Sequence, residues 1–227
     1  MPPQKQFEKD VVPTSVGDLI ITFLGHGSLM FDFNEVNISV DPFSQVADYS
    51  QLPKADLILI THEHHDHLDQ GALASVRTEE SDLILTETCA RQVEGGIVMQ
   101  NGDVRTVRGI QVEAVPAYNM VHKRDKGQPF HPKGIGNGYI LTFGDQRVYI
   151  AADTENTPEM KTLTDIDVAF LPMNLPYTMT PEMVADAAKA FKPKILYPYH
   201  FGNTDTAKLV NLLSDEVGIE VRIRKMA

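Results

Sequence analysis

Residues 56–69 read DLILITHEHHDHLD and join an apolar run to a dense group of histidines. The run from 56 to 60 shows no polar alternation, which is typical of a strand covered on both faces. Four of the chain's eight histidines fall within six residues, with one aspartate among them: His62, His64, His65, Asp66 and His67. Imidazole and carboxylate suit zinc, manganese and iron(II), and a loop at a strand end holds such ligands rigidly. The stretch therefore predicts a metal site where a buried strand ends.

The spacing within this group indicates two neighbouring metal positions. Alternate residues of an extended loop face the same way, so His62 and His64 are expected to face one position. Asp66 and His67 lie at the start of the next predicted helix and are expected to face a neighbouring position. His65 points the opposite way and is expected to face solvent or to support the ligands from outside. A solvated polar loop is the competing interpretation, and the density of histidines after a buried strand disfavours it.

The composition is that of one globular domain. The 227 residues are 42% hydrophobic and 22% charged, which excludes disordered and fibrous classes. No break in composition divides the chain, so one domain is expected. Cys89 is the only cysteine, which excludes an intramolecular disulfide and a thiolate metal site. Any metal must therefore be held by nitrogen and oxygen atoms.

The charge balance favours a small-molecule partner. A net charge of −11 disfavours a nucleic-acid-binding surface, which normally needs a basic stripe. Residues 118–138 depart from this balance, because they hold one acid and four bases: Asp125, Lys123, Arg124, Lys126 and Lys133. Such a loop would steer an anionic substrate, a phosphate or a carboxylate, toward the metals. A merely solvated loop stays open as the alternative.

Neither a signal peptide nor a membrane span is predicted. Residues 1–10 lack an apolar segment, and no stretch approaches the ~18 apolar residues of a spanning helix. We therefore expect a cytoplasmic protein without a membrane partner, and an exported form with a removed leader stays open. Residues 1–18 are interpreted as an N-terminal lead-in to a single domain over residues 19–227. No oligomeric state is predicted.

Predicted strands and helices alternate along the chain. Apolar runs predict strands over 19–24, 29–33, 36–40, 56–60, 83–86, 139–143, 148–151, 167–171, 195–197 and 219–224, and a strand pair over 104–115. Helices are predicted over 68–76, from Pro181 onward with Thr180 as the N-cap, and over 206–217. Residues 116–137 show no apolar period, and a loop of that length in a compact domain is usually functional, so it is the candidate lid. The two halves of the chain are expected to form similar α/β units that lie face to face.

Four segments, in this order, resemble the metallo-β-lactamase-fold superfamily of metal-dependent hydrolases: DPF at 41–43, THEHHDHLD at 61–69, AADT at 151–154 and PYH at 198–200. The stretches FLGHGS, DVAFLP and YTMTPE are most similar to its small lactonase- and phosphodiesterase-type members. The resemblance extends over residues 19–202. It implies an α/β fold, a four-layer αβ/βα sandwich of the metallo-β-lactamase type, with two mixed sheets flanked by helices.

The resemblance also implies a binuclear metal site. It assigns seven residues: His62 and His64 to the first ion; Asp66, His67 and His200 to the second; Asp153 as a bridge between the ions; and Asp41 as a support for the ligand loop. Asp153 and His200 each follow a predicted buried strand, where open α/β sheets place their sites, which agrees with this assignment. Two divalent ions are implied, zinc by preference, with manganese or iron as alternatives.

The chain departs from the family pattern at one position. The family usually takes a third histidine for the first ion from the loop after a strand that corresponds to residues 112–115, and here residues 116–119 read PAYN. His131 from the long loop, or else His122, is the candidate replacement. With neither, a single bound ion would be the resting state. Tyr118 and His131 are also the candidate catalytic proton donors to the oxyanion or the leaving group.

The leading function is hydrolysis by a metal-activated hydroxide, oriented by Asp66, of a small anionic ester, lactone or phosphodiester. Two alternatives stay open: a non-catalytic metal-binding or sensing module, and a metallo-β-lactamase-fold ribonuclease, against which the net charge and short length argue. A flavin-dependent reductase on this fold is excluded, because it would need a glutamate in place of His64 and a flavin domain. His26 in the stretch GHGS is interpreted either as a supporting residue or as a substrate contact.

Overall fold

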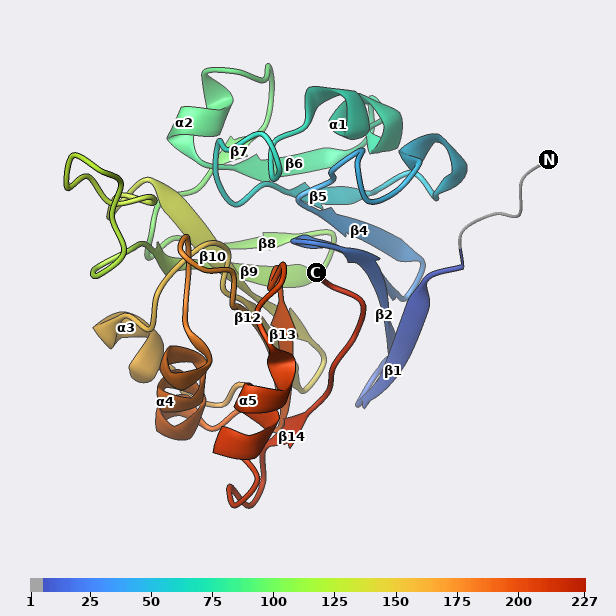
Figure 1. Ribbon diagram of the computed structural model, residues 1–227. Helices are drawn as coiled ribbons and strands as arrows, with labels where there is room; N and C mark the ends of the chain where they lie inside the picture. The colour runs from blue at the N-terminus through green and yellow to red at the C-terminus, as the bar shows by residue number, and fades with distance from the viewer. Residues whose placement is uncertain (1–5) are drawn as a thin grey trace.

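Two seven-stranded sheets form the centre of the molecule (Figure 1). The computed structural model describes residues 6–227. The strands of the first sheet are β1 (Glu8–Thr14), β2 (Gly17–Gly25), β3 (Ser28–Phe33), β4 (Val36–Val40), β5 (Leu57–Leu59), β6 (Asp82–Leu85) and β7 (Ile97–Val98). Those of the second are β8 (Val104–Val107), β9 (Ile110–Ala117), β10 (Gly136–Phe143), β11 (Gln146–Ile150), β12 (Val168–Pro172), β13 (Ile195–Tyr199) and β14 (Glu220–Val221). Each half of the described chain thus builds one sheet.

Both sheets are mixed and follow the same pattern. The first has the strand order β1 to β7, with antiparallel pairs up to β4 and parallel pairs from β4 onward. The second has the order β14 to β8, with antiparallel pairs among β8 to β11 and parallel pairs from β11 to β14. This repetition confirms the expected pair of similar α/β halves.

The main hydrophobic core lies between the two sheets. Leu19, Ile21 and Phe23 alternate along β2 and are buried in one cluster with residues of the second sheet. Phe170 on β12 stacks on Tyr197 of β13 with ring centroids 5.1 Å apart. Phe170 also lies 6.3 Å from Phe23, centroid to centroid, so aromatic rings join the two halves. Because neither sheet can bury its inner face alone, the two halves form a single packed unit.

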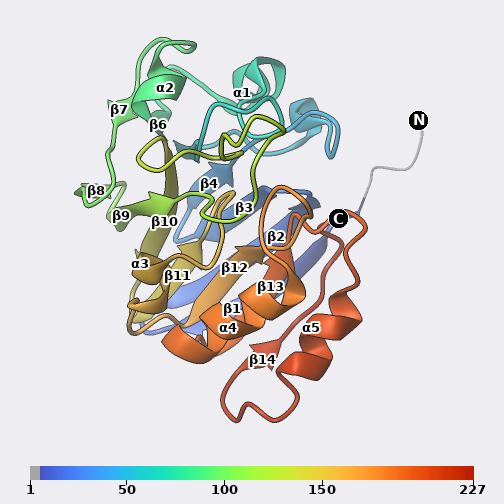
Figure 2. The ribbon, with the colours of Figure 1, turned by 60° about the vertical axis from the view of Figure 1, so that its left-hand side comes forward.

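Helices cover the outer faces and complete four layers (Figures 1 and 2). The helical segments are η1 (Tyr49–Gln51), α1 (Gln70–Val76), α2 (Glu87–Ala90), α3 (Pro158–Lys161), α4 (Pro181–Phe191) and α5 (Thr206–Leu212). The first three, η1, α1 and α2, pack on the first sheet around one buried hydrophobic cluster. The last three, α3, α4 and α5, pack on the second sheet around another. The expected four-layer sandwich of two mixed sheets is therefore confirmed. Within residues 6–227, no helix is long and apolar enough to cross a membrane.

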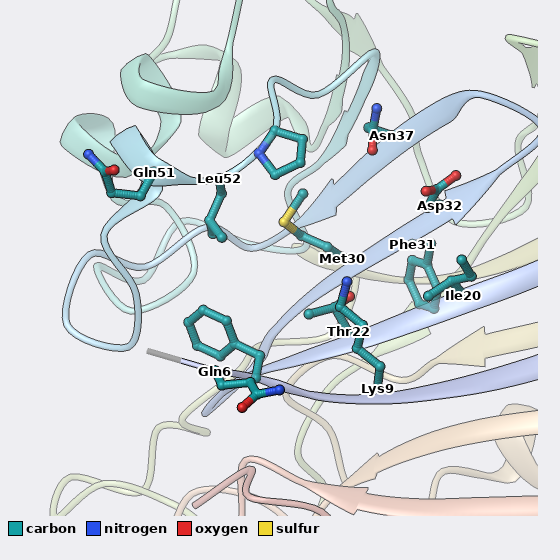
Figure 3. Close-up of a pocket in the computed structure, with 12 residues that line it drawn as sticks. Gln6, Lys9, Ile20, Thr22, Met30, Phe31, Asp32, Asn37, Gln51 and Leu52 are labelled. Carbon is teal, nitrogen blue, oxygen red and sulfur yellow. The ribbon is translucent and has the colours of Figure 1, made fainter. Parts of the chain in front are cut away.

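A groove of about 810 Å³ lies on the outer face of β1, β2 and β3, beside η1 (Figure 3). Ile20, Met30 and Leu52 give it apolar surface, and Lys9 and Asp32 give it charge. The histidines and aspartates of the predicted metal site are absent from its lining. This groove is therefore separate from the site that the sequence predicts.

Local sequence signals account for most element boundaries. Asn34 and Glu35 both adopt positive φ, as the two-residue turn between β3 and β4 requires. Helix α4 begins at Pro181, and the Thr180 side chain accepts a hydrogen bond from a backbone N–H of its first turn, as predicted. The last helix was expected to extend over 206–217, but α5 ends at Leu212. The last strand was expected over 219–224, but β14 spans only two residues. Val217 is fully exposed, so no burial favours a further helical turn.

The N-terminal segment belongs to the first sheet. Strand β1 pairs with the length of β2, from Glu8 opposite Phe23 to Thr14 opposite Gly17. The domain was expected to begin at residue 19, but this position lies inside β2. Residues 6–18 of the expected lead-in, which the structure describes, are therefore part of the domain. Residues 1–5 of that lead-in lie outside the described residues. The alternation of apolar and charged residues in β1 is weak, which explains why sequence patterning missed this strand.

Asp10 on β1 ties the start of the described chain to its C-terminal segment. Arg224 Nη2 lies 2.7 Å from both carboxylate oxygens of Asp10, and the Tyr197 hydroxyl donates to the same carboxylate. Replacing Asp10 by Asn is expected to lower the free energy of unfolding at pH 7 by about 2 kcal/mol, because Arg224 loses its anionic partner. Urea unfolding of both proteins measures the difference.

The pH dependence of that difference has a defined sign. Burial alone would raise the pKa of Asp10, but the hydrogen bonds from Tyr197 and Arg224 outweigh burial and lower it. A lowered pKa stabilises the fold above the unfolded-state value of about 3.9, and this contribution is lost as the pH falls through the folded-state pKa. The two unfolding curves should therefore converge in acid. Asp32→Asn, at an exposed position of β3, is the control. A difference in unfolding free energy between the wild type and Asp10→Asn that stays constant down to pH 3 would contradict the role given to the Asp10 carboxylate.

Candidate metal centre

The predicted ligands meet at one edge of the two sheets, where strands end. His62 and His64 follow β5, Asp153 follows β11, and His200 follows β13. The carboxyl ends of neighbouring parallel strands lie at the same sheet edge, and this is where open α/β sheets place their sites. His131 comes instead from a long loop, residues 118–135, which we call the flap. The flap is the yellow-green loop that projects beyond β9 and β10 in Figure 1.

The first group consists of His62, His64, His131 and Asp153. One potential ligand atom from each residue lies within 4.8 Å of the others. His62 Nε2 is 3.1 Å from His64 Nδ1, and His131 Nε2 is 3.2 Å from Asp153 Oδ2. Three imidazoles and one carboxylate form the ligand set that zinc and similar divalent ions accept.

The second group consists of His26, Asp66, His67 and His200, again with ligand atoms within 4.8 Å of one another. Asp66 Oδ2 is 2.9 Å from His26 Nε2 and 3.6 Å from His200 Nε2. Asp153 Oδ1 lies 3.5 Å from both His67 Nε2 and His200 Nε2. Asp153 therefore directs Oδ1 to the second group and Oδ2 to the first.

Asp41, which follows β4, supports the ligand loop from a buried position. Its carboxylate accepts hydrogen bonds from the backbone N–H of Thr61 at 2.8 Å and from the Thr61 hydroxyl at 2.6 Å. It also lies 2.8 Å from His67 Nδ1. A proton on Nδ1 leaves His67 Nε2 facing the second group, so Asp41 sets the orientation of this ring.

The charges of the centre stabilise a cation. Burial alone would raise the pKa of Asp153, but the neighbouring His200, His67 and His131 outweigh burial and hold that pKa well below its usual range. Burial alone would lower the pKa of His67, but the carboxylates of Asp153 and Asp41 outweigh it and raise the pKa to about 9. Burial also lowers the pKa of His62, which favours the neutral imidazole that binds metals.

Three buried atoms in the centre lack the partners that buried polar atoms normally have. His67 Nε2, His200 Nε2 and Asp153 Oδ1 have no hydrogen-bond partner, and Asp153 Oδ1 lies 3.5 Å from each of the two imidazole nitrogens. Unsatisfied buried polar atoms are rare and costly. A divalent cation would satisfy all three at once, so these residues fit a metal ion.

A cavity of about 410 Å³ gives access to both groups. Beside residues of the centre it is lined by His65 and by four residues from the flap and from the loop after β12: Arg124, Phe130, Asn174 and Tyr177. Phe130 and Tyr177 form an edge-to-face pair with centroids 5.0 Å apart, and the Arg124 guanidinium lies 5.1 Å from the Phe130 ring centroid. The cavity thus combines an aromatic wall with one cationic side chain of the flap.

The structure brings together six of the residues that sequence reasoning assigned to the two ions: His62, His64, Asp66, His67, Asp153 and His200. Of the two candidate replacements for the missing histidine, His131 joins the first group, whereas His122 Nδ1 lies 2.8 Å from Glu155 Oε1 outside both groups. His26 also joins, although the sequence left its role open. His26 directly follows the apolar strand β2, as Asp153 and His200 follow β11 and β13. A position just after an apolar strand was therefore the sequence signal that could have found it.

Tyr118 does not face the centre. Its hydroxyl donates to Glu159 Oε2 at 2.8 Å and accepts from Lys133 Nζ at 3.3 Å, on the side of the flap that packs on α3. This placement does not support the expected role of Tyr118 as a proton donor to the substrate. The side chain of His65 is largely exposed, as expected.

The fold and the centre define a metallo-β-lactamase-fold protein with a candidate His/Asp metal site. The family model for the beta-lactamase superfamily domain matches residues 20–200. A UPF0173 metal-dependent hydrolase from Methanopyrus kandleri is 30% identical over 198 residues, which cover 80% of this chain and 84% of that protein. The chain therefore belongs to the beta-lactamase superfamily and, within it, to the UPF0173 metal-dependent hydrolases.

Solved structures agree with this assignment. A protein from Parabacteroides distasonis, assigned as a metal-dependent hydrolase, is 50% identical with a TM-score of 0.93, and the match covers 98% of this chain and 100% of that one. Igni18, a metallo hydrolase from Ignicoccus hospitalis, is 23% identical with a TM-score of 0.76 over 92% of this chain and 96% of its own. The second likeness is a likeness of fold.

Proposed function

We propose that the protein is a hydrolase with a binuclear metal centre, zinc by preference, that acts on a small anionic ester, lactone or phosphodiester. The observation that carries the proposal is the position of Asp153, which directs one carboxylate oxygen to each of two histidine-rich groups. A carboxylate shared in this way suits two ions held side by side. Manganese and iron are the alternative metals for the same ligand set.

Two divalent ions, when bound, would supply an activated water at neutral pH and a Lewis acid for the scissile group. The chain's own residues would hold and orient them. His62, His64 and His131 would hold the first ion, and His67 and His200 the second. Asp66 belongs to the second group and, through its contact with His26, presents a fixed acceptor to a water or substrate O–H in the cavity.

The cavity supports the choice of a small anionic substrate. A volume of about 410 Å³ admits a small molecule, which suits a hydrolase better than a closed metal store. Arg124 lines the cavity, and within residues 6–227 its guanidinium contacts the Phe130 carbonyl and ring and forms no ion pair with a carboxylate. A guanidinium free of acidic partners is suited to a phosphate or carboxylate group. The net charge of −11 continues to argue against a ribonuclease.

Metal content and turnover test the proposal together. Protein purified without chelator would be analysed for zinc, manganese and iron, then assayed on a phosphodiester, bis(p-nitrophenyl) phosphate, and on a lactone and a thioester. We expect about two ions per chain, loss of turnover with EDTA and recovery with added Zn²⁺. A protein that retains metal but hydrolyses nothing in this panel would favour the sensing module, and one that retains no metal would contradict the centre.

A further inference from the structure

Glu155 is a fully buried carboxylate beside the centre, and the chemistry proposed above does not use it. Three consecutive backbone N–H groups at the base of the flap donate to it: Met120 and Val121 to Oε2, both at 2.7 Å, and His122 to Oε1 at 2.6 Å. The Asn119 side-chain amide adds a bond to Oε1 at 3.1 Å. Successive N–H groups that converge on an anion form a strong and specific binding arrangement.

Asn119 connects Glu155 to His131, the potential metal ligand that the flap contributes. Its Oδ1 accepts from His131 Nδ1 at 2.7 Å and from the His131 backbone N–H at 2.8 Å. Its own backbone N–H donates to the His131 carbonyl at 2.9 Å. With the Nδ1 proton held by Asn119, His131 directs Nε2 toward Asp153. Asn119 thus sets both the position and the tautomer of His131.

We propose that Glu155 is a positioning residue, which holds the base of the flap so that His131 reaches the first group of the metal centre. Glu155 lies two residues after Asp153, so one short segment supplies the shared carboxylate and the anchor of the flap. Thr154 between them accepts the Tyr118 N–H at 3.0 Å and so joins the same contact. The proposal rests on the metal centre proposed above, but its first test does not require metal.

Substitution by glutamine is a sharp test, because it keeps the size of Glu155 and replaces an accepting oxygen with an amide that donates. If the new NH2 group replaced Oε2, it would face the N–H groups of Met120 and Val121. If it replaced Oε1, it would face the His122 N–H and the Asn119 side-chain amide. Either placement sets donors against donors. Glu155→Gln is therefore expected to free the base of the flap.

The first measurement is limited trypsin digestion of protein freed of metal by chelation. Mass spectrometry maps cleavage after Lys123, Arg124 and Lys126 of the flap. We expect Glu155→Gln to speed cleavage at these bonds about tenfold, while cleavage elsewhere stays as in the wild type. Faster cleavage throughout the chain would show a general loss of folding and would overturn the positioning role.

The second measurement is titration with Zn²⁺ alone. Glu155→Gln is expected to weaken one of two Zn²⁺ sites by about 10–100-fold and to leave the other near its wild-type affinity. Glu159→Gln is the matched control, because Glu159 also contacts the flap, through Lys133 and Tyr118, but is partly exposed. Equal weakening of both sites in Glu155→Gln, or the same effect in Glu159→Gln, would overturn the proposal.

Asn119→Ala provides a second variant, which removes the side-chain bond to Glu155 but leaves the three backbone bonds in place. The N–H groups of residues 120–122 still reach Glu155, so flap cleavage should rise less, whereas Zn²⁺ affinity at one site should fall as in Glu155→Gln. Wild-type Zn²⁺ binding by Asn119→Ala would overturn the link from Glu155 to His131, even if Glu155→Gln fails to fold. A wild-type protein that binds two Zn²⁺ ions but hydrolyses no substrate would contradict the proposed function and leave these results standing.

Discussion

Replacing Asp153 by Asn is expected to lower turnover by about 10³-fold, which corresponds to about 4 kcal/mol of transition-state stabilisation at 1.36 kcal/mol per tenfold change. Asp153 directs one carboxylate oxygen to each group, with Oδ2 3.2 Å from His131 and Oδ1 3.5 Å from His67 and His200. The amide keeps the shape of the side chain but removes the negative charge that two bound ions would share in the proposed centre. Repulsion between the cations then opposes their binding together.

Metal analysis separates this explanation from a loss of folding. The Asp153→Asn protein should retain about one divalent ion or fewer per chain, and added Zn²⁺ should raise its melting temperature less than that of the wild type. Its far-UV circular dichroism should be unchanged. Asp32→Asn, at an exposed position outside both groups, is the matched carboxylate-to-amide control and should behave as the wild type. Full metal content with full turnover in Asp153→Asn would remove the basis for a binuclear centre.

Replacing His131 by Ala is expected to lower turnover by about 10²-fold and to weaken the first of the two ions, because one of three imidazoles of that group is lost. His122→Ala is the informative comparison, since His122 comes from the same flap but lies against Glu155 outside both groups. It should retain most of the turnover and both ions. Zn²⁺ titration and steady-state kinetics of the two variants measure the contrast.

The reverse result would change the assignment of the third histidine. If His122→Ala lost an ion and His131→Ala did not, the flap would have to rearrange when metal binds. The cavity would then differ from the one described, because His131 and Phe130 line it together.

Local patterns predicted the elements that carry the ligands. The apolar run before THEHHDH predicted β5, and similar runs predicted the strands that precede Asp153 and His200. These signals are reliable because a strand buried on both faces must be apolar along its whole length. The resemblance supplied the pairing of ligands into two groups, and Asp41 lies where it implied, with hydrogen bonds to Thr61 and His67.

The flap shows where pattern reasoning ends. A loop without apolar periodicity contains no signal for its path, so the sequence left His131 and His122 as alternatives and placed Tyr118 at the substrate. Packing decided these questions. The buried carboxylate of Glu155 binds the flap backbone and the His122 ring, which keeps His122 outside both groups, while Glu159 and Lys133 bind the Tyr118 hydroxyl beside α3.

The sequence by itself therefore determined the ligands that follow buried strands, because hydrophobic burial and strand ends leave local traces in the chain. Its single cysteine determined the nitrogen and oxygen character of the centre, and its resemblance to a known superfamily implied the fold class. The choice of His131, the entry of His26 and the anchoring roles of Glu155 and Asn119 were decided only by the tertiary structure. Asn119 and Glu155 are 36 positions apart in the chain and meet through a hydrogen bond that no periodicity encodes. Contacts of this kind arise from how a loop folds back on the finished sheets, so they become visible only in three dimensions.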